Sequence, residues 1–336
     1  MQGDIIGLDV INLWYNNDLL HTEKIYVIMN DPTMNNLFTL IMILMVLVNT
    51  INMGAQLDLE IIKEVFKKPI GPIVGFISQF VFMPLFSFLT GWLLSDDMLF
   101  RLGLFVLGCC PGGTGSNFWT LLLGGDINLS ITMTFLSTVL ALGMMPLWIF
   151  TLGPLLTEGA LRIPFGQLVF SLVTLILPTA FGMWIRWRWI KAAKIMEKII
   201  VPFTLLTVLF IMTAGIYINL FIFLLITPLM ILAGFIVAIA GYLFGALFAW
   251  ILQLKLPQIT AVAIETSFQN GGIAFILLKM SLEEPFGELA SVAPVAQLMI
   301  TGLPLWLLLA CLKIYQKCFK KDEVKDVKYS AVGRQY

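Results

Sequence analysis

Two stretches, CCPGGTGSN at residues 109–117 and IETSFQNGG at residues 264–272, interrupt long apolar runs and decide how this chain folds. In the first stretch, a proline removes a backbone donor and three glycines permit an unwound backbone. In the second, seven of the nine residues are polar or glycine. Both stretches therefore predict helices that are broken near their middle. A kink that serves only packing is the alternative for either one.

The surroundings of these stretches have the composition of a membrane protein. The chain has 336 residues, of which 59% are hydrophobic and 12% charged, whereas a soluble domain has roughly 25% charged residues. Its 20 basic residues balance 20 acidic ones, which excludes a nucleic-acid binder with a basic surface. Four cysteines fit no metal or disulfide framework, and we expect no cofactor.

Helix is the structure that satisfies every backbone group inside lipid, and a span needs about 20 apolar residues. The sequence therefore predicts an all-α polytopic membrane protein, with an external segment at residues 1–34, a transmembrane domain at 35–315 and a cytoplasmic tail at 316–336. Nine spans are predicted, at residues 35–56, 69–94, 98–122, 127–153, 164–186, 198–218, 227–253, 258–282 and 288–315.

The basic residues predict the orientation of these spans. With the amino terminus outside, 16 of the 20 fall on the cytoplasmic side, in residues 57–68, 186–198 and 313–336 and at Lys255. We therefore expect an outside amino terminus and a cytoplasmic carboxyl terminus, with the plasma membrane as the predicted location.

Glu265 is the one acidic residue in the middle of a predicted span. An ionised carboxylate at that depth costs roughly 2.5–3.5 kcal/mol and needs a partner, yet no Lys or Arg lies mid-span. A bound cation or a proton is the natural partner. The alternative is a protonated carboxyl group that makes an interhelical hydrogen bond.

Neutral oxygens accompany this carboxylate. Ser130 and Thr134 are four residues apart, so their hydroxyls share one helix face, and Gln79 lies midway through the second span. Singly, such groups usually bond a backbone carbonyl or hold helices together. Together with Asn117 and Gln269 they form an oxygen set that suits Na⁺.

The motifs of the third, fourth and eighth spans closely resemble the bile acid:sodium symporter family, solute carrier family 10. The stretches that carry the resemblance are residues 109–117, GDINLSITMT at 125–134, ST at 137–138, ALGMMP at 141–146 and ETSFQN at 265–270. The resemblance covers nearly the whole chain from about residue 35. It implies a core domain, a panel domain and two broken helices that cross near two sodium sites.

The resemblance also implies the site residues. One sodium site would use Ser116, Asn117, Ser130, Thr134 and Glu265. The other would use Gln79, Glu265 and Gln269 with the backbone carbonyls of Thr266 and Phe268. Substrate is expected beside Asn270, Gly271 and Gly272. After Asn270 the well-studied bile acid carriers have further polar residues, whereas this chain has Gly271, Gly272 and Ile273.

The function that the resemblance implies is sodium-coupled symport of an amphipathic organic anion, of the bile acid or steroid-conjugate type, by alternating access. The alternative is a membrane protein of the same fold that acts as a receptor or regulatory binding protein without transport. An enzyme is not expected, because the single histidine is His21 in the external segment and no second mid-span carboxylate exists.

Overall fold

The computed structural model describes residues 2–314 except 4–6, 16–17, 30–32, 57–58, 68, 114, 158–164, 211–212, 215–216 and 218–219. The predicted tail at residues 316–336 lies outside the described residues. The transmembrane part is all-helical, and the prediction of an all-α polytopic membrane protein is confirmed.

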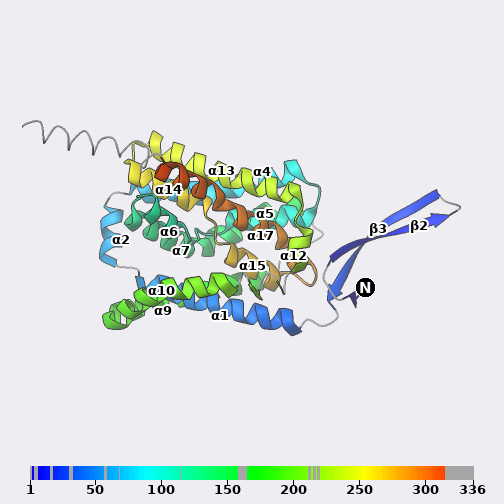
Figure 1. Cartoon of the computed structure of the whole chain (residues 1–336), viewed down its shortest axis with the longest axis horizontal. Helices are drawn as coiled ribbons and strands as arrows, with labels where there is room; N and C mark the ends of the chain where they lie inside the picture. The colour runs from blue at the N-terminus through cyan, green and yellow to red at the C-terminus, as the bar shows by residue number, and fades with distance from the viewer. Residues whose placement is uncertain are drawn as a thin grey trace, which may run out of the picture.

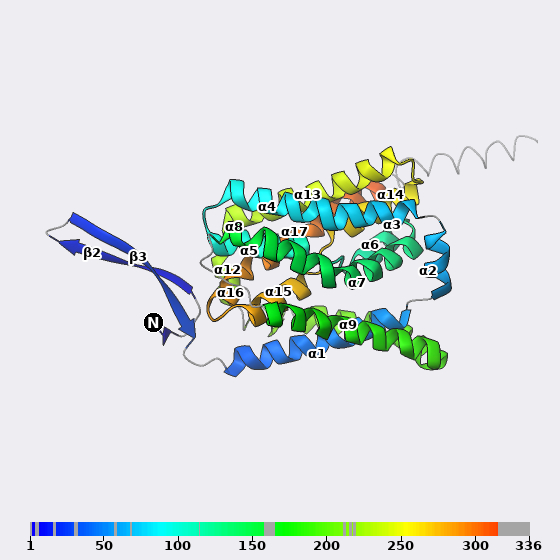
Figure 2. The same ribbon diagram turned by 180° about the vertical axis from the view of Figure 1, so that it is seen from behind.

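The predicted external segment forms β-structure that was not foreseen from the sequence. Within the described residues it holds a three-stranded sheet of order β1-β3-β2, with β1 at Gln2–Gly3, β2 at Gly7–Tyr15 and β3 at Asp18–Met29. Strands β2 and β3 pair antiparallel, and Figures 1 and 2 show this hairpin reaching away from the helices. Two asparagines, a residue type common in tight turns, separate the two strands in the sequence.

Helices occupy every predicted span. Among the described residues, four helical segments are long and apolar enough to cross a membrane without interruption: Ile70–Leu94, Ile127–Leu156, Pro228–Ile251 and Phe286–Ile314. The elements of these segments are α3 (Ile70–Ile77), η1 (Ser78–Phe82), α4 (Met83–Leu94), α7 (Ile127–Thr151), α8 (Gly153–Leu156), α13 (Pro228–Ile251), α16 (Phe286–Ala290) and α17 (Val292–Thr301).

The third and eighth predicted spans are broken, as the sequence predicted. The first break separates α5 (Met98–Cys109) from α6 (Gly115–Leu122). The second separates α14 (Leu256–Ser267) from α15 (Gly271–Ser281). Each break therefore falls inside the stretch that was singled out for its proline, glycine and polar residues.

The sixth span differs from its predicted bounds of 198–218. Helix α10 runs from Ile190 to Phe210, and a short helix α12 (Leu220–Leu225) follows it. Hydropathy placed the start too late because Lys191 and Lys194 interrupt the apolar run. Lysine is nevertheless a good helix former, and the helix extends beyond its apolar part.

Three helices form a separate layer. Figures 1 and 2 show α1 (Thr33–Gln56), α9 (Phe165–Arg188) and α10 side by side, with most of the other helices in a second body and short α2 (Leu59–Phe66) connecting the two. Helices α1 and α9 meet through glycines, because a Cβ on Gly54 would collide with the carbonyl oxygen of Thr179 and one on Gly182 with that of Ile51. Small residues allow such close backbone contact between membrane helices.

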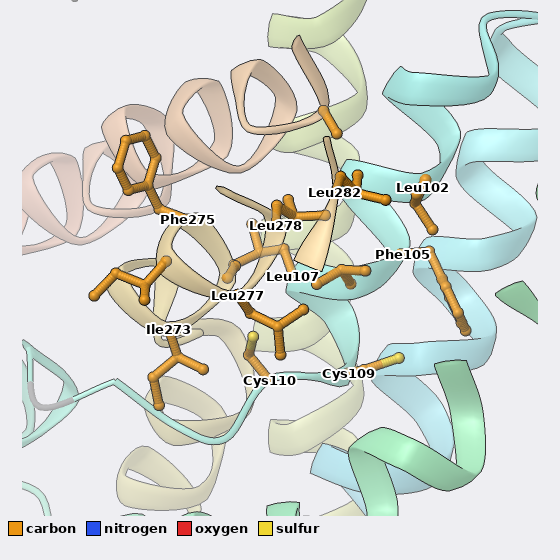
Figure 3. Close-up of a cluster of buried hydrophobic side chains, with 14 of the residues drawn as sticks. Leu102, Phe105, Leu107, Cys109, Cys110, Ile273, Phe275, Leu277, Leu278 and Leu282 are labelled. Atoms are coloured by element: carbon orange, nitrogen blue, oxygen red, sulfur yellow. The ribbon is translucent and has the colours of Figure 1, made fainter. Parts of the chain in front are cut away.

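A buried apolar cluster joins the two broken helices. In Figure 3 the side chains of α5 meet those of α15, and Leu107, Cys109 and Cys110 belong to the same cluster as Leu277 and Leu278. All five side chains are fully buried. This packing holds the end of α5 close to α15, so the two breaks face each other.

Candidate functional site

The two breaks bond to each other through their backbones. The N–H of Gly113 donates to the carbonyl oxygen of Phe268 at 2.7 Å, and the N–H of Asn270 donates to that of Pro111 at 2.9 Å. Backbone groups that leave a helix far from water need such partners. The unwound stretches therefore stabilise each other where they cross.

Glu265 lies in the last turn of α14, directly beside this crossing, and is 1% exposed. Its Oε2 accepts from the Ser116 hydroxyl at 2.5 Å and from the Ser130 hydroxyl at 3.3 Å. Its Oε1 accepts from the Thr134 hydroxyl at 2.7 Å. The predicted common face of Ser130 and Thr134 is confirmed, and it is turned toward the carboxylate.

Gly112 leaves the space that the carboxylate occupies. A Cβ on this glycine would collide with Oε1 of Glu265. The N–H of Gly112 donates to the Ser137 hydroxyl at 3.1 Å, which holds the unwound chain against α7. The absence of a side chain at residue 112 is therefore a condition for the position of the carboxylate.

The acceptor oxygens around Glu265 outnumber the available protons. The Ser116 hydroxyl lies 2.8 Å from the carbonyl oxygen of Gly113 as well as near the carboxylate. The Ser130 hydroxyl lies 2.8 Å from Oδ1 of Asn117. Because each hydroxyl carries one proton, it satisfies one acceptor at a time. A cation with oxygen ligands would satisfy the remaining lone pairs, so the donor set fits Na⁺.

The ion pairs Arg101–Asp96 and Lys279–Glu288 do not involve Glu265. The described part of the chain holds no group of three His, Cys, Asp or Glu residues that would bind a transition metal. One carboxylate among neutral oxygens is instead the ligand type of a hard cation. Ser116 lies in the first turn of α6, so the positive end of that helix also favours the negative charge.

Gln79 and Gln269 meet on another side of the crossing. The Gln79 amide donates to Oε1 of Gln269 at 2.6 Å and to the carbonyl oxygen of Cys110 at 2.7 Å. Its own Oε1 is buried without a hydrogen-bond partner. Gln79 lies in the π-helical turn η1, a geometry that is frequent at functional sites. The unpartnered oxygen is the feature that a second cation would satisfy.

The two carbonyls assigned to the second sodium site already accept hydrogen bonds. The carbonyl oxygen of Thr266 accepts from the Gln269 amide at 2.9 Å, and that of Phe268 accepts from Gly113. A carbonyl oxygen has two lone pairs, so each retains one for a further partner. The Thr266 hydroxyl donates a hydrogen bond to the carbonyl oxygen of Val262 in the same helix at 2.8 Å.

The three residues expected near substrate differ in their surroundings. Asn270 caps α15 through its Oδ1, which accepts from the N–H of Ile273 at 3.1 Å. Gly271 is buried against the Leu298 side chain of α17. Gly272 is half-buried, and a Cβ there would lie 3.7 Å from Val46 of α1. Of the two glycines, therefore, Gly272 is the one that faces the separate layer.

Sequence reasoning missed three groups of this site. The Thr120 hydroxyl donates to Ser130 at 3.3 Å, Ser137 accepts from Gly112, and the Cys110 carbonyl accepts from Gln79. Thr120 follows Ser116 by four residues on one helix, and this spacing was a usable signal. A backbone carbonyl has no such signal in a sequence.

A comparison with known families bears on this arrangement of oxygens. Residues 40–226 match the model of the sodium/bile acid symporter family. The chain belongs to that family. It is 30% identical over 298 residues to the ileal sodium/bile acid cotransporter of Mus musculus, covering 88% of this chain and 85% of that protein.

Other relatives differ in name and in length. The sodium-dependent organic anion transporter of Bos taurus is 33% identical over 246 residues, which is 73% of this chain and 65% of that protein. The P3 protein of Homo sapiens is 32% identical over 251 residues, which is 74% of this chain and 53% of the relative. The family is one of sodium-coupled transporters and not of enzymes, and the chain is a multi-pass membrane protein.

Proposed function

We propose that this chain is a sodium-coupled symporter of an amphipathic organic anion of the bile acid or steroid-conjugate type. The observation that carries the proposal is the buried Glu265 carboxylate at the crossing, with hydroxyls from α6 and α7 as neighbours. Ser116, Asn117, Ser130, Thr134 and Glu265 bind one sodium ion in this proposal.

The second sodium ion is placed at Gln79 and Gln269, with the carboxylate of Glu265 shared between the two ions. The unpartnered Oε1 of Gln79 supports this placement. The free lone pairs of the Thr266 and Phe268 carbonyls supply further ligands. Binding of both ions then stabilises the crossing, because each ion bridges the unwound stretches to α7 or η1.

Alternating access in this proposal is a relative movement of two parts of the protein. The layer of α1, α9 and α10 corresponds to a panel domain, and the body that holds the crossing corresponds to a core domain. Gly272 lies on the part of the core that faces α1, and the Oδ1 of Asn270 lies beside this glycine. Substrate bound between the parts would thus touch the stretch that the sodium ions order, and this contact couples the two ligands.

Uptake measurements in cells test the proposal. Labelled taurocholate and a labelled steroid sulfate are offered in Na⁺ medium and in choline medium. Na⁺-dependent accumulation of either anion is the expected result. Ser130→Ala and Thr134→Ala each remove one oxygen ligand, and each is expected to raise the half-saturating Na⁺ concentration about 5-fold. This factor corresponds to a loss of about 1 kcal/mol in the free energy of sodium binding.

Thr213→Ala is the control, since the hydroxyl of this exposed residue donates to the carbonyl oxygen of Leu209 in α10. Equal uptake in both media for every anion tested, with the protein at the cell surface, would contradict symport. The alternative function, that of a receptor or regulatory binding protein without transport, would then replace symport.

A further inference from the structure

Two cavities are lined by residues of both α3 and α7. The first has a volume of about 30 Å³ and contains Gln79 and Glu265 in its wall. Gln79 is 2% exposed, and its Oε1 is buried without a hydrogen-bond partner. Each helix contributes one face at helical spacing, with Pro72, Gly75, Phe76 and Gln79 from α3 and η1 and Met133, Leu136, Ser137 and Leu140 from α7.

The second cavity lies toward the start of both helices, since its lining residues Gly71 and Leu129 precede Gly75 and Met133 of the first cavity by four residues, or one helical turn. It has a volume of about 200 Å³, and Gly71 and Leu129 are among its lining residues. Its other lining residues are mostly polar, including the carboxylates of Glu64 and Asp126, and none is basic. This cavity can therefore hold a hydrated cation, whereas the first is a confined space beside the sodium ligands.

Two side chains of α7 separate the cavities. Leu129 packs on Gly71, where an added Cβ would lie 3.0 Å from the leucine side chain. Met133 packs on Gly75 so closely that an added Cβ would collide with its terminal methyl group. Both side chains are at most 5% exposed and belong to one apolar cluster with Val74. An apolar contact thus lies between the residues that line the two cavities, and Met133 lines the first cavity together with Glu265.

We propose that Met133, seated on Gly75 and backed by Leu129, is the cytoplasmic gate through which sodium leaves the Gln79–Glu265 site. The inference rests on the proposed function, because it assumes that sodium binds there. It adds a route inside the core for the ions, separate from the substrate path between core and panel.

The chemistry of the contact suits a gate. An apolar constriction excludes a hydrated ion and opens only when its side chains move apart. Methionine has three rotatable bonds and adapts its shape readily. The residue opposite it is a glycine, so no second side chain from that position blocks the groove when the methionine changes its rotamer. Glu64 and Asp126 at the outer cavity attract a released cation.

Efflux of ²²Na⁺ from liposomes tests the gate. The full chain is reconstituted, loaded with ²²Na⁺ and diluted into sodium medium without any organic anion. Met133→Ala removes most of the side chain between the two cavities. It is expected to raise efflux about 10-fold over wild type, which corresponds to an activation free energy lower by about 1.4 kcal/mol. Met133→Leu fills a similar volume and should stay close to wild type.

Met145→Ala is the matched control. Met145 is on the same helix and is also buried, but it packs in the large apolar cluster and lines neither cavity. If Met133→Ala fails to fold, the smaller truncation Met133→Val carries the same prediction. Efflux from a folded Met133 truncation that matches Met145→Ala would overturn the gate.

The outcomes separate the gate from the proposed function. Na⁺-dependent anion uptake by wild type, with no leak in the Met133 truncations, rejects the gate and leaves symport intact. No effect of Na⁺ on uptake or on the thermal stability of wild type rejects sodium binding itself, and the gate is rejected with it.

Discussion

One carboxyl group carries the charge of the proposed sodium sites. Glu265 is buried at the crossing, with Ser116, Ser130 and Thr134 as its hydrogen-bond donors. Hydroxyls can serve either a carboxylate or a cation beside it, since the oxygen that donates a proton also offers lone pairs. The residue therefore fits a site that alternates between an ion-bound and an ion-free form.

Replacing Glu265 by Gln is expected to abolish Na⁺-dependent stabilisation and uptake. The amide is nearly isosteric with the carboxyl group, so the fold is retained while the negative charge is lost. The measurement is the melting temperature of purified protein in Na⁺ and in choline. Glu283→Gln, at an exposed carboxylate, is the control and should keep the sodium response. A sodium shift of wild-type size in Glu265→Gln would make the carboxylate purely structural.

Gly112→Ala is expected to weaken sodium binding without removing any ligand. The added methyl group meets Oε1 of Glu265 and must displace the carboxylate from its hydroxyl partners. Overpacking of this kind costs typically 1–3 kcal/mol, which corresponds to about a 5- to 150-fold higher half-saturating Na⁺ concentration. Gly143→Ala is the comparison, because a Cβ there meets nothing within 4 Å. Equal sodium dependence of the two variants would refute the contact.

At the scale of elements, an ion pair ties α15 to its neighbours. The ammonium group of Lys279, in the last turn of α15, lies 3.5 Å from a carboxylate oxygen of Glu288 in α16. It also donates to the Thr39 hydroxyl of α1 at 3.2 Å. The two charged side chains are 7% and 4% exposed. This pair anchors the end of the helix that begins at the crossing.

Glu288→Gln is expected to lower the free energy of unfolding by about 3 kcal/mol, because it removes the charge that balances a buried ammonium group. The double variant Lys279→Met/Glu288→Leu should recover most of that loss, since apolar residues can replace a buried pair. Thermal unfolding in detergent measures both. If Glu288→Gln were as stable as wild type, the ion pair would not contribute to the stability of the fold.

At the scale of the whole molecule, charge predicts orientation. The ends of α9 and α10 that carry Arg188 and Lys191 are predicted to be cytoplasmic, whereas the ends near Asp97 and Glu284 are predicted to be outside. In a cysteine-free background, Asp97→Cys and Glu284→Cys should react with an impermeant thiol reagent applied to intact cells. Lys191→Cys should react only after permeabilisation. Labelling of Lys191→Cys in intact cells would reverse the topology.

The sequence by itself determined the class of fold and the two breaks, because long apolar runs and their proline, glycine and polar interruptions are local properties. It also placed Ser130 and Thr134 on one face, since helical periodicity follows from spacing alone. These predictions depended on no contact between distant residues.

Only the tertiary structure decided which groups meet across the chain. Packing brings Glu265 to Ser116, 149 residues away, and leaves Oε1 of Gln79 without a partner. It turns Gly271 toward Leu298 and Gly272 toward α1, although the two glycines are adjacent in the sequence. It also seats Met133 on Gly75. Such contacts depend on the angle and distance at which two helices pack, and the helix propensity of either segment does not determine that geometry.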